Sequence, residues 1–220
     1  AGAVGMRLGW TVIAPGDRAE VLVAVDGATT ATTTPTWQAA TGMGGMDGMG
    51  GMGGRGSGAG ETVLTVVASG PDAVVAAPSG SLNRVESLVD AVVDRSRTFR
   101  LAMGGMMMGG GDGMSFTING ASFDPQRIDV TASVGTVEEW TVTNASPMAH
   151  PFHLHVWPFQ VIETSDRRTP PSGWKDVVDV PAGGWVRLCV AFADFAGRTV
   201  YHCHILDHED RGMMGIIEVQ

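Results

Sequence analysis

All six histidines of this 220-residue chain fall in two short segments near its C-terminus. The first segment reads HPFHLH (150–155) and the second HCHILDH (202–208), and Met213 follows five residues after the second. Imidazole and thiolate are ligands that copper favours, and a cysteine, two histidines and a distant methionine form a blue-copper electron-transfer site. Cys203, His208, Met213 and one histidine of the first segment supply such a set. The surplus histidines indicate part of a second copper site.

The segment around Cys203 reads TVYHCH, which is rich in the β-branched and aromatic residues typical of strands. Successive side chains on a strand point to opposite faces, so His202 and His204 share one face while Cys203 points away from them. The same alternation groups His153 and His155 on a second strand. If the two strands are neighbours, we expect four imidazoles to converge on one face.

The opposite face is predicted to hold the cysteine. His150 stands an odd number of residues from His153, so it can meet Cys203 there. The loop that follows can then bring in His208 and Met213. In this arrangement the cysteine joins two metals covalently through the histidines beside it, which is a short route for electrons.

The motifs HPFHLH and HCHILDHEDRGMM resemble the C-terminal copper signature of the multicopper oxidases, the family of laccases, bilirubin oxidases and bacterial cuprous oxidases. Three further stretches have counterparts in that family: PGDRAEVLV (15–23), FTING (116–120) and GWKDVVDVPAGG (173–184). The resemblance implies type 1 copper ligands at His150, Cys203, His208 and, as the weak axial ligand, Met213. It implies a type 2 ligand at His153 and type 3 ligands at His155, His202 and His204.

The resemblance also implies a cupredoxin-like Greek-key β-sandwich with oxidase activity. One-electron oxidation of a substrate at type 1 copper would be coupled to four-electron reduction of O2 to water at a trinuclear cluster. Electrons would pass from Cys203 through His202 and His204. By family position Glu209 is the candidate proton donor, and a solvated loop acid is its ordinary alternative. Asp176 is expected to be an ordinary surface acid, and orientation of a ligand is the alternative.

One departure from the family concerns the N-terminal ligands. The family's cluster uses eight histidines, four of them from paired His-x-His motifs near the N-terminus, and this chain has no histidine before position 150. It also begins without Met or a signal peptide, in a stretch that resembles the late part of the family's second domain. We therefore expect the C-terminal portion of a longer oxidase, with type 1 copper complete and the cluster partial. Missing N-terminal domains would supply the rest, and family habit predicts a periplasmic or extracellular location.

Composition agrees with a β-rich chain. Glycine is abundant, long helical patterns are missing, and no apolar run reaches the length that spans a membrane. The net charge of −9 argues against nucleic acid as a partner. Two cysteines describe no disulfide framework, and Cys189, in an alternating strand pattern, is predicted to be a buried apolar residue.

The chain is predicted to be all-β, with two regions joined by a connector. Residues 1–69 would be the C-terminal part of one cupredoxin-like domain with a Met/Gly-rich insert at 42–60, 70–97 a connector with room for a short helix, and 98–220 the C-terminal cupredoxin domain. In the first region strands are expected at 8–13, 19–25 and 62–68. In the last they are expected near 97–103, 115–118, 127–131, 136–143, 159–163, 185–192, 199–203 and 215–219.

Methionine supplies a second functional signal, because residues 42–54 read GMGGMDGMGGMGG and another Gly/Met cluster covers 103–114. Thioether sulfur suits Cu(I), and so glycine-rich a backbone disfavours a stable helix with a methionine stripe. The alternative is a low-complexity loop with methionine as filler, but exposed methionine is costly and easily oxidised. We expect Cu(I) handling by Met43, Met46, Met49, Met52, Met103, Met106, Met107 and Met108, with Met114 in the second cluster.

Similar methionine-rich inserts occur in the bacterial cuprous oxidases that the motifs resemble. Met148 matches a position that lies beside the type 1 site in those proteins, whereas Ser146 stands where they carry an acidic substrate-site residue. Only the methionine-rich inserts favour Cu(I) as the reducing substrate; phenols, Mn(II) and bilirubin are the alternatives, and Ser146 departs from the Cu(I) site of those oxidases.

Two other classes of protein use similar ligands. A non-catalytic copper carrier or resistance protein would combine a type 1 site with methionine-rich loops, but it has no use for the four surplus histidines. A copper nitrite reductase-like enzyme does not usually place a second cluster ligand directly after its type 1 cysteine. Zinc also accepts nitrogen and sulfur ligands, but it needs no axial Met213. The oxidase is therefore the favoured hypothesis.

Overall fold

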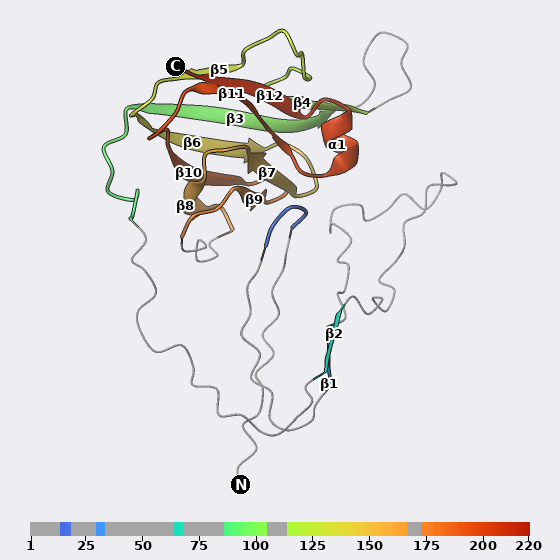
Figure 1. Ribbon diagram of the computed structural model, residues 1–220. Coiled ribbons are helices and arrows are strands. Elements are labelled where there is room, and N and C mark those ends of the chain that lie inside the picture. The colour runs from blue at the N-terminus through green and yellow to red at the C-terminus, as the bar shows by residue number, and fades with distance from the viewer. Residues whose placement is uncertain (1–13, 19–29, 34–63, 68–85, 105–113, 167–172) are drawn as a thin grey trace. The chain divides into compact units, whose positions relative to one another are not determined.

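The computed structural model describes residues 14–18, 30–33, 64–67, 86–104, 114–166 and 173–220 (Figure 1). The chain divides into two compact units, Ala1–Val12 with Ala19–Arg84, and Ile13–Arg18 with Val85–Gln220. In the first unit, β1 (Thr30–Thr33) pairs antiparallel with β2 (Leu64–Val67). The second of these strands falls within the predicted range 62–68. The expected strands 8–13 and 19–25 and the insert 42–60 lie outside the described residues.

Two five-stranded sheets form the second unit (Figure 1). One sheet has the order β4-β3-β6-β10-β8, built from β3 (Arg95–Gly104), β4 (Ser115–Ile118), β6 (Val137–Asn144), β8 (Phe159–Thr164) and β10 (Trp185–Ala191). The other has the order β5-β12-β11-β7-β9, built from β5 (Val130–Ala132), β7 (His150–Leu154), β9 (Val177–Val180), β11 (Gly197–Cys203) and β12 (Met214–Val219). The predicted all-β, cupredoxin-like sandwich is confirmed.

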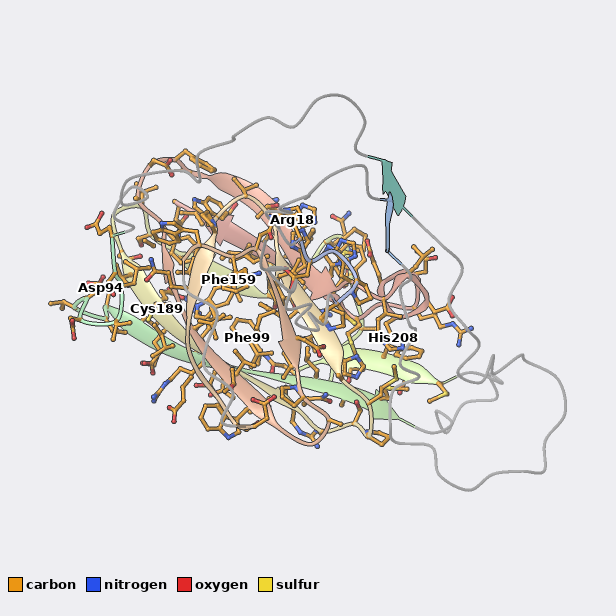
Figure 2. The ribbon with its side chains drawn as sticks, turned by 90° about the horizontal axis from the view of Figure 1, so that it is seen from below. Arg18, Asp94, Phe99, Phe159, Cys189 and His208 are labelled. Carbon is orange, nitrogen blue, oxygen red and sulfur yellow. The ribbon has the colours of Figure 1, made fainter. Side chains whose placement is uncertain are left out.

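Both sheets bury one face against the other, as the period of two in their sequences requires. Along β6 buried and half-buried residues alternate, and Trp140 and Val142 are fully buried. Phe99 from the same sheet lies 4.6 Å from the ring of Trp140 and 5.1 Å from that of Tyr201 across the core. Figure 2 shows Phe99 and Phe159 between the sheets. This aromatic cluster packs directly on β7 and β11, the strands that carry the histidine motifs.

A buried ion pair links the core to the edge of the sandwich. The Glu138 carboxylate accepts hydrogen bonds from Arg97 at 2.5 and 2.8 Å and from the Trp140 indole at 2.8 Å. Because Glu138 is almost fully buried, both of its oxygens need these donors. The pair joins β3 to β6, which are neighbouring parallel strands.

In the second unit, local predictions and the observed elements differ in two places. All eight strands predicted after residue 97 are present within a few residues, and β7 follows from the first histidine motif. β9 was not predicted, since VVDV is too short to show a period. The predicted loop after Cys203 instead contains a helix, α1 (Leu206–Asp210), at one end of the sandwich (Figure 1). Its sequence LDHED places acids in the first turn, which favours a helix start.

Part of the predicted connector, residues 86–97, lies within the described residues. Residues 86–97 contain no helix, and β3 already begins at Arg95. The described part of the chain also holds no helix with the length and hydropathy needed to cross a bilayer.

Candidate metal centre

Neighbouring strands bring the two histidine motifs together. β11 pairs antiparallel with β7, so that His202 is opposite His153 and Cys203 is opposite Phe152. This is the side-by-side arrangement predicted from the sequence. Its consequence is two clusters of ligand atoms on opposite faces of the same strand pair.

The first cluster, called here the thiol centre, consists of His150, Cys203 and His208. The Cys203 Sγ lies 3.5 Å from the Nδ1 atoms of His150 and His208, and these two nitrogens are 3.2 Å apart. His150 begins β7, Cys203 ends β11 and His208, labelled in Figure 2, belongs to α1. All three side chains are buried. Three donor atoms therefore face one another in a space shielded from water.

A hydrogen-bond network determines the tautomer of His150. Its Nε2 lies 2.6 Å from the Ser146 hydroxyl, which also contacts the Asn144 Oδ1 at 2.8 Å and the Met148 carbonyl at 3.0 Å. Asn144 uses its amide hydrogens on three carbonyls, so its Oδ1 accepts. The single hydroxyl proton of Ser146 goes to one of these acceptors, and Nε2 of His150 must donate to Ser146. The Nδ1 lone pair is then left facing Cys203.

His208 and Met213 are held by packing and backbone contacts. The His208 ring stacks on Phe116, with centroids 4.4 Å apart, and the Arg211 guanidinium lies 5.8 Å from the centroid of the Phe116 ring. Met213 is fully buried; its amide donates to the His208 carbonyl at 2.9 Å, and its carbonyl accepts from the Cys203 amide at 3.0 Å. Met213 thus lies directly beside the thiol centre.

Burial controls the protonation of the thiol centre. It raises the pKa of Cys203 to about 12, and burial with a smaller contribution from His208 lowers the pKa of His150 to about 4. The pKa of His208 is also lowered by burial. Neutral imidazoles next to a thiol that ionises only beside a cation are the donor set of a soft metal ion.

The second cluster, called here the imidazole centre, is formed by His153, His155, His202 and His204. The Nε2 atoms of His155 and His202 are 2.9 Å apart, and the ring of His153 lies 4.4 Å from that of His155. The ring of His204 lies 5.2 Å from His153 and 5.5 Å from His202. The predicted convergence of four imidazoles is therefore observed. His202 is buried, whereas the other three are half-buried.

Backbone and carboxylate oxygens orient this centre. The Nδ1 of His153 donates to the Asp176 carbonyl at 2.7 Å. The Nδ1 of His202 lies 3.1 Å from the Cys203 carbonyl and 3.2 Å from the Glu209 carboxylate. Both rings thus carry their proton on Nδ1 and leave Nε2 for a metal. Burial lowers the pKa of both histidines, which favours the neutral, ligating form.

The donor chemistry of both centres fits copper, which accepts imidazole nitrogen and cysteine sulfur. The structure assigns further contacts to two predicted acids. Glu209 contacts His202, while its predicted role as proton donor stays a prediction. Asp176 is more than a surface acid, because its carbonyl orients His153 and its carboxylate pairs with Arg18 at 2.8 Å. Every residue has a backbone carbonyl, so the sequence gives no sign of the contact between the Asp176 carbonyl and His153, and only the structure could reveal it.

The methionine predictions fall into two sets. Met103 lies in β3 and packs partly buried against the core, which differs from the predicted glycine-rich cluster outside the core. Met114 is exposed, and Met148 is half-buried in the loop before β7. The others lie outside the described residues: Met43, Met46, Met49, Met52, Met106, Met107 and Met108. Their role in Cu(I) handling stays a prediction.

Cys189 lies buried in β10 as a free thiol, as predicted. Burial raises its pKa, so it is an unreactive core residue. Sequence reasoning missed Asn144 and Phe116 as neighbours of the thiol centre. For Asn144, the buried last residue of β6, no pattern distinguishes this role from that of an ordinary polar residue at a strand end.

Comparison with known proteins identifies relatives of this chain. Over 109 residues the chain is 42% identical to the multicopper oxidase mco of Staphylococcus aureus, a match that covers 47% of this chain and 24% of that protein. It is 32% identical to the cell division protein FtsP of Dickeya dadantii, across 98% of this chain and 43% of that protein. The chain thus spans less than half the length of either relative.

A solved structure is similar over most of the chain. The multicopper oxidase from Campylobacter jejuni, described as a metallo-oxidase, aligns with a TM-score of 0.67 and 25% identity, covering 89% of this chain and 42% of that one. Residues 96–220, which contain both centres, match the family model for multicopper oxidases. The chain therefore belongs to the multicopper oxidase family.

Proposed function

We propose that this chain is the C-terminal portion of an oxidase that couples one-electron oxidation of a reducing substrate to four-electron reduction of O2 to water. The observation that carries the proposal is the adjacency of Cys203 and His202, which are successive residues of β11 and belong to the two different centres. A protein that only stores copper has no need to join a buried thiol to a second cluster of imidazoles.

Each centre has a proposed copper type. The thiol centre would hold type 1 copper through His150, Cys203 and His208, with the buried Met213 as weak axial ligand. The imidazole centre would hold part of a trinuclear cluster, with His153 as type 2 ligand and His155, His202 and His204 as type 3 ligands. Bound copper supplies one-electron redox chemistry at the first centre and oxygen reduction at the second. Ligands from outside the described residues would complete the cluster.

The chain's own residues prepare these sites for electron transfer. The aromatic core and Phe116 keep water away from the thiol centre, and the Ser146 contact holds His150 with its Nδ1 towards the sulfur. Little then needs to rearrange when charge moves, because every ligand is already packed in position. The peptide between Cys203 and His202 provides a short covalent path between the centres.

Glu209 is the proposed proton donor for oxygen reduction. Its carboxylate is partly exposed and lies 3.2 Å from the Nδ1 of His202, so it touches both solvent and the imidazole centre. A carboxyl group in this position can take a proton from water and pass it inwards. The contact also gives Glu209 a second task, which is to orient His202.

Cu(I) is the favoured substrate, and phenols are the alternative. The support is the pair of Gly/Met clusters at 42–54 and 103–114, since thioethers suit Cu(I), together with the likeness to a protein described as a metallo-oxidase. Exposed Met114 lies just before β4, the strand that carries the Phe116 ring stacked on His208. A periplasmic or extracellular location, where copper homeostasis would need such an activity, is part of the proposal.

Steady-state O2 consumption by the full-length protein tests the function. Cu(I) and a phenolic donor are compared for the natural protein, for deletion of 42–54, and for a variant with leucine at Met43, Met46, Met49 and Met52. Loss of Cu(I) turnover with phenol oxidation intact in both variants supports Cu(I) handling. An equal fall for both donors rejects it. Absence of O2 consumption with either donor by the copper-loaded protein contradicts the oxidase itself.

A further inference from the structure

A turn far from the histidine motifs in sequence lies against the imidazole centre. Residues 14–18 form this turn, closed by a hydrogen bond from the Asp17 amide to the Ala14 carbonyl at 2.9 Å. Gly16 has a φ of +79°, and a Cβ placed there would lie 2.5 Å from the Cδ2 atom of His204. The bare backbone of Gly16 therefore rests on the imidazole ring, and no larger residue fits unless His204 moves.

Two ion pairs fasten the same turn to the segment before β9. Asp17 pairs with the Lys175 ammonium at 2.9 Å, and Arg18 pairs with Asp176 at 2.8 Å. Arg18 is largely exposed, so its pair adds little to overall stability. Burial acts to raise the pKa of Asp176, but the hydrogen bond and charge of Arg18 outweigh it and leave the pKa below its ordinary value. The main effect of the two pairs is therefore to fix the turn against residues 175 and 176, rather than to stabilise the fold.

The receiving segment in turn orients a histidine. The carbonyl of Asp176 accepts hydrogen bonds from the Nδ1 of His153 at 2.7 Å and from the Leu154 amide at 3.0 Å. A shift of residue 176 would therefore rotate the His153 ring. The turn contacts the imidazole centre in two ways, directly at His204 and through Asp176 at His153. Among the described residues, no hydrogen bond or ion pair joins the turn to the thiol centre.

We propose that Gly16, Asp17 and Arg18 are positioning residues for the imidazole centre, and that they set the angles of His204 and His153 for metal binding. The inference rests on the proposed function for the identity of the metal. It goes beyond that function by assigning part of the metal site to residues that precede the sandwich in the chain and bind no metal themselves. Oriented ligands bind metal about 10- to 100-fold more tightly than the same ligands left free to turn.

Replacement of Gly16 tests the direct contact. Gly16→Ala is compared with Gly120→Ala, a matched control whose φ of +78° imposes the same backbone strain but whose Cβ would meet nothing within 4 Å. Both variants of the full-length protein are titrated with Cu(II). The blue absorption of the thiolate-bound copper is recorded alongside the electron paramagnetic resonance signal of copper bound by imidazoles alone. We expect Gly16→Ala to weaken the second signal about 10-fold or more and to leave the blue absorption unchanged.

Charge reversal tests the indirect contact, including the case in which Gly16→Ala does not fold. Arg18→Asp alone should weaken copper binding at the imidazole centre by several-fold, and Arg18→Asp combined with Asp176→Arg should restore it. Equal imidazole-bound copper in Gly16→Ala and Gly120→Ala, or no rescue by the double variant, overturns the inference. A natural protein without blue absorption would instead contradict the proposed function, so the two failures are distinguishable.

Discussion

The thiol centre and the imidazole centre share one pair of strands but differ in how far the fold encloses them. All three residues of the thiol centre are buried, and neighbours such as Ser146 and Phe116 hold their rings. In the imidazole centre only His202 is buried, and its partners are half-buried. The Gly16 backbone and the Asp176 carbonyl, rather than an aromatic core, hold it in place.

This difference separates a centre that is complete within the sandwich from one that is open on one side. A buried set of three strong ligands and an adjacent methionine needs nothing more from outside. A metal held by half-buried imidazoles can still accept further ligands. The open centre is therefore the one at which other protein segments and O2 are expected to bind.

Removal of the thiolate should give the largest effect and should affect one centre only. In Cys203→Ser we expect complete loss of blue absorption and of turnover, because in the proposed function the sulfur both binds the metal and carries the electrons. Copper held by imidazoles alone should persist. Electronic absorption and paramagnetic resonance of the copper-loaded protein measure both. Cys189→Ser is the matched control and should stay blue; colour in Cys203→Ser would refute the assignment of the thiol centre.

Acid should destabilise the metal-free protein through the buried histidines. The pKa of His150 is lowered from 6.5 to about 4. Between these two pH values the imidazole is therefore protonated in the unfolded chain and neutral in the folded protein. Stability is then fully present above pH 6.5 and falls as the pH approaches 4, by up to about 3 kcal/mol for this one group. Urea unfolding at pH 7 and pH 5 measures the loss. His150→Gln should reduce the pH dependence, and an unchanged slope would contradict a neutral buried imidazole.

Loss of the Ser146 hydroxyl should weaken the thiol centre alone. Ser146→Ala leaves the Nε2 of His150 without its 2.6 Å partner, so the ring can turn and the tautomer is no longer selected. We expect copper affinity at the thiol centre to fall about 10-fold, with the blue absorption shifted and imidazole-bound copper unaffected. Competition with a copper chelator, followed at the blue band, measures this affinity. Ser146→Thr retains the hydroxyl and should behave as the natural protein does; equal loss in both variants would point to packing instead.

Replacement of Glu209 should produce the smallest effect on binding and should appear only at the open centre. Glu209→Gln keeps an acceptor oxygen near the Nδ1 of His202 but cannot deliver a proton at neutral pH. Copper content should change by a few-fold at most, whereas O2 reduction should slow about 100-fold. Parallel assays of metal content and O2 consumption separate the two roles. Equal rates in both proteins would leave Glu209 with orientation alone.

The ligands and the pairing of their strands could be predicted because both follow short-range rules. Because side chains alternate along a strand, His202 and Cys203 point to opposite faces, and the motifs themselves contain the candidate ligand residues. The contacts that orient those ligands could not be predicted in the same way. The Asp176 carbonyl belongs to the backbone, and Gly16 meets His204 only through the tertiary fold.

The two local errors have physical reasons as well. β9 is a four-residue strand that is held by its pairing with β7, and its own sequence is too short to show the alternation typical of a strand. Helix α1 has five residues, fewer than a helix needs to form by itself in water. Packing and the placement of His208 between Phe116 and Cys203 stabilise it, and these are tertiary contacts.

Anomalous scattering at the copper absorption edge, from crystals of the copper-loaded full-length protein, tests the central claim most directly. We expect one peak among the Cys203 Sγ and the Nδ1 atoms of His150 and His208, and at least one separate peak beside the Nε2 atoms of His155 and His202. A sulfur without metal beside it in fully loaded protein would contradict the account.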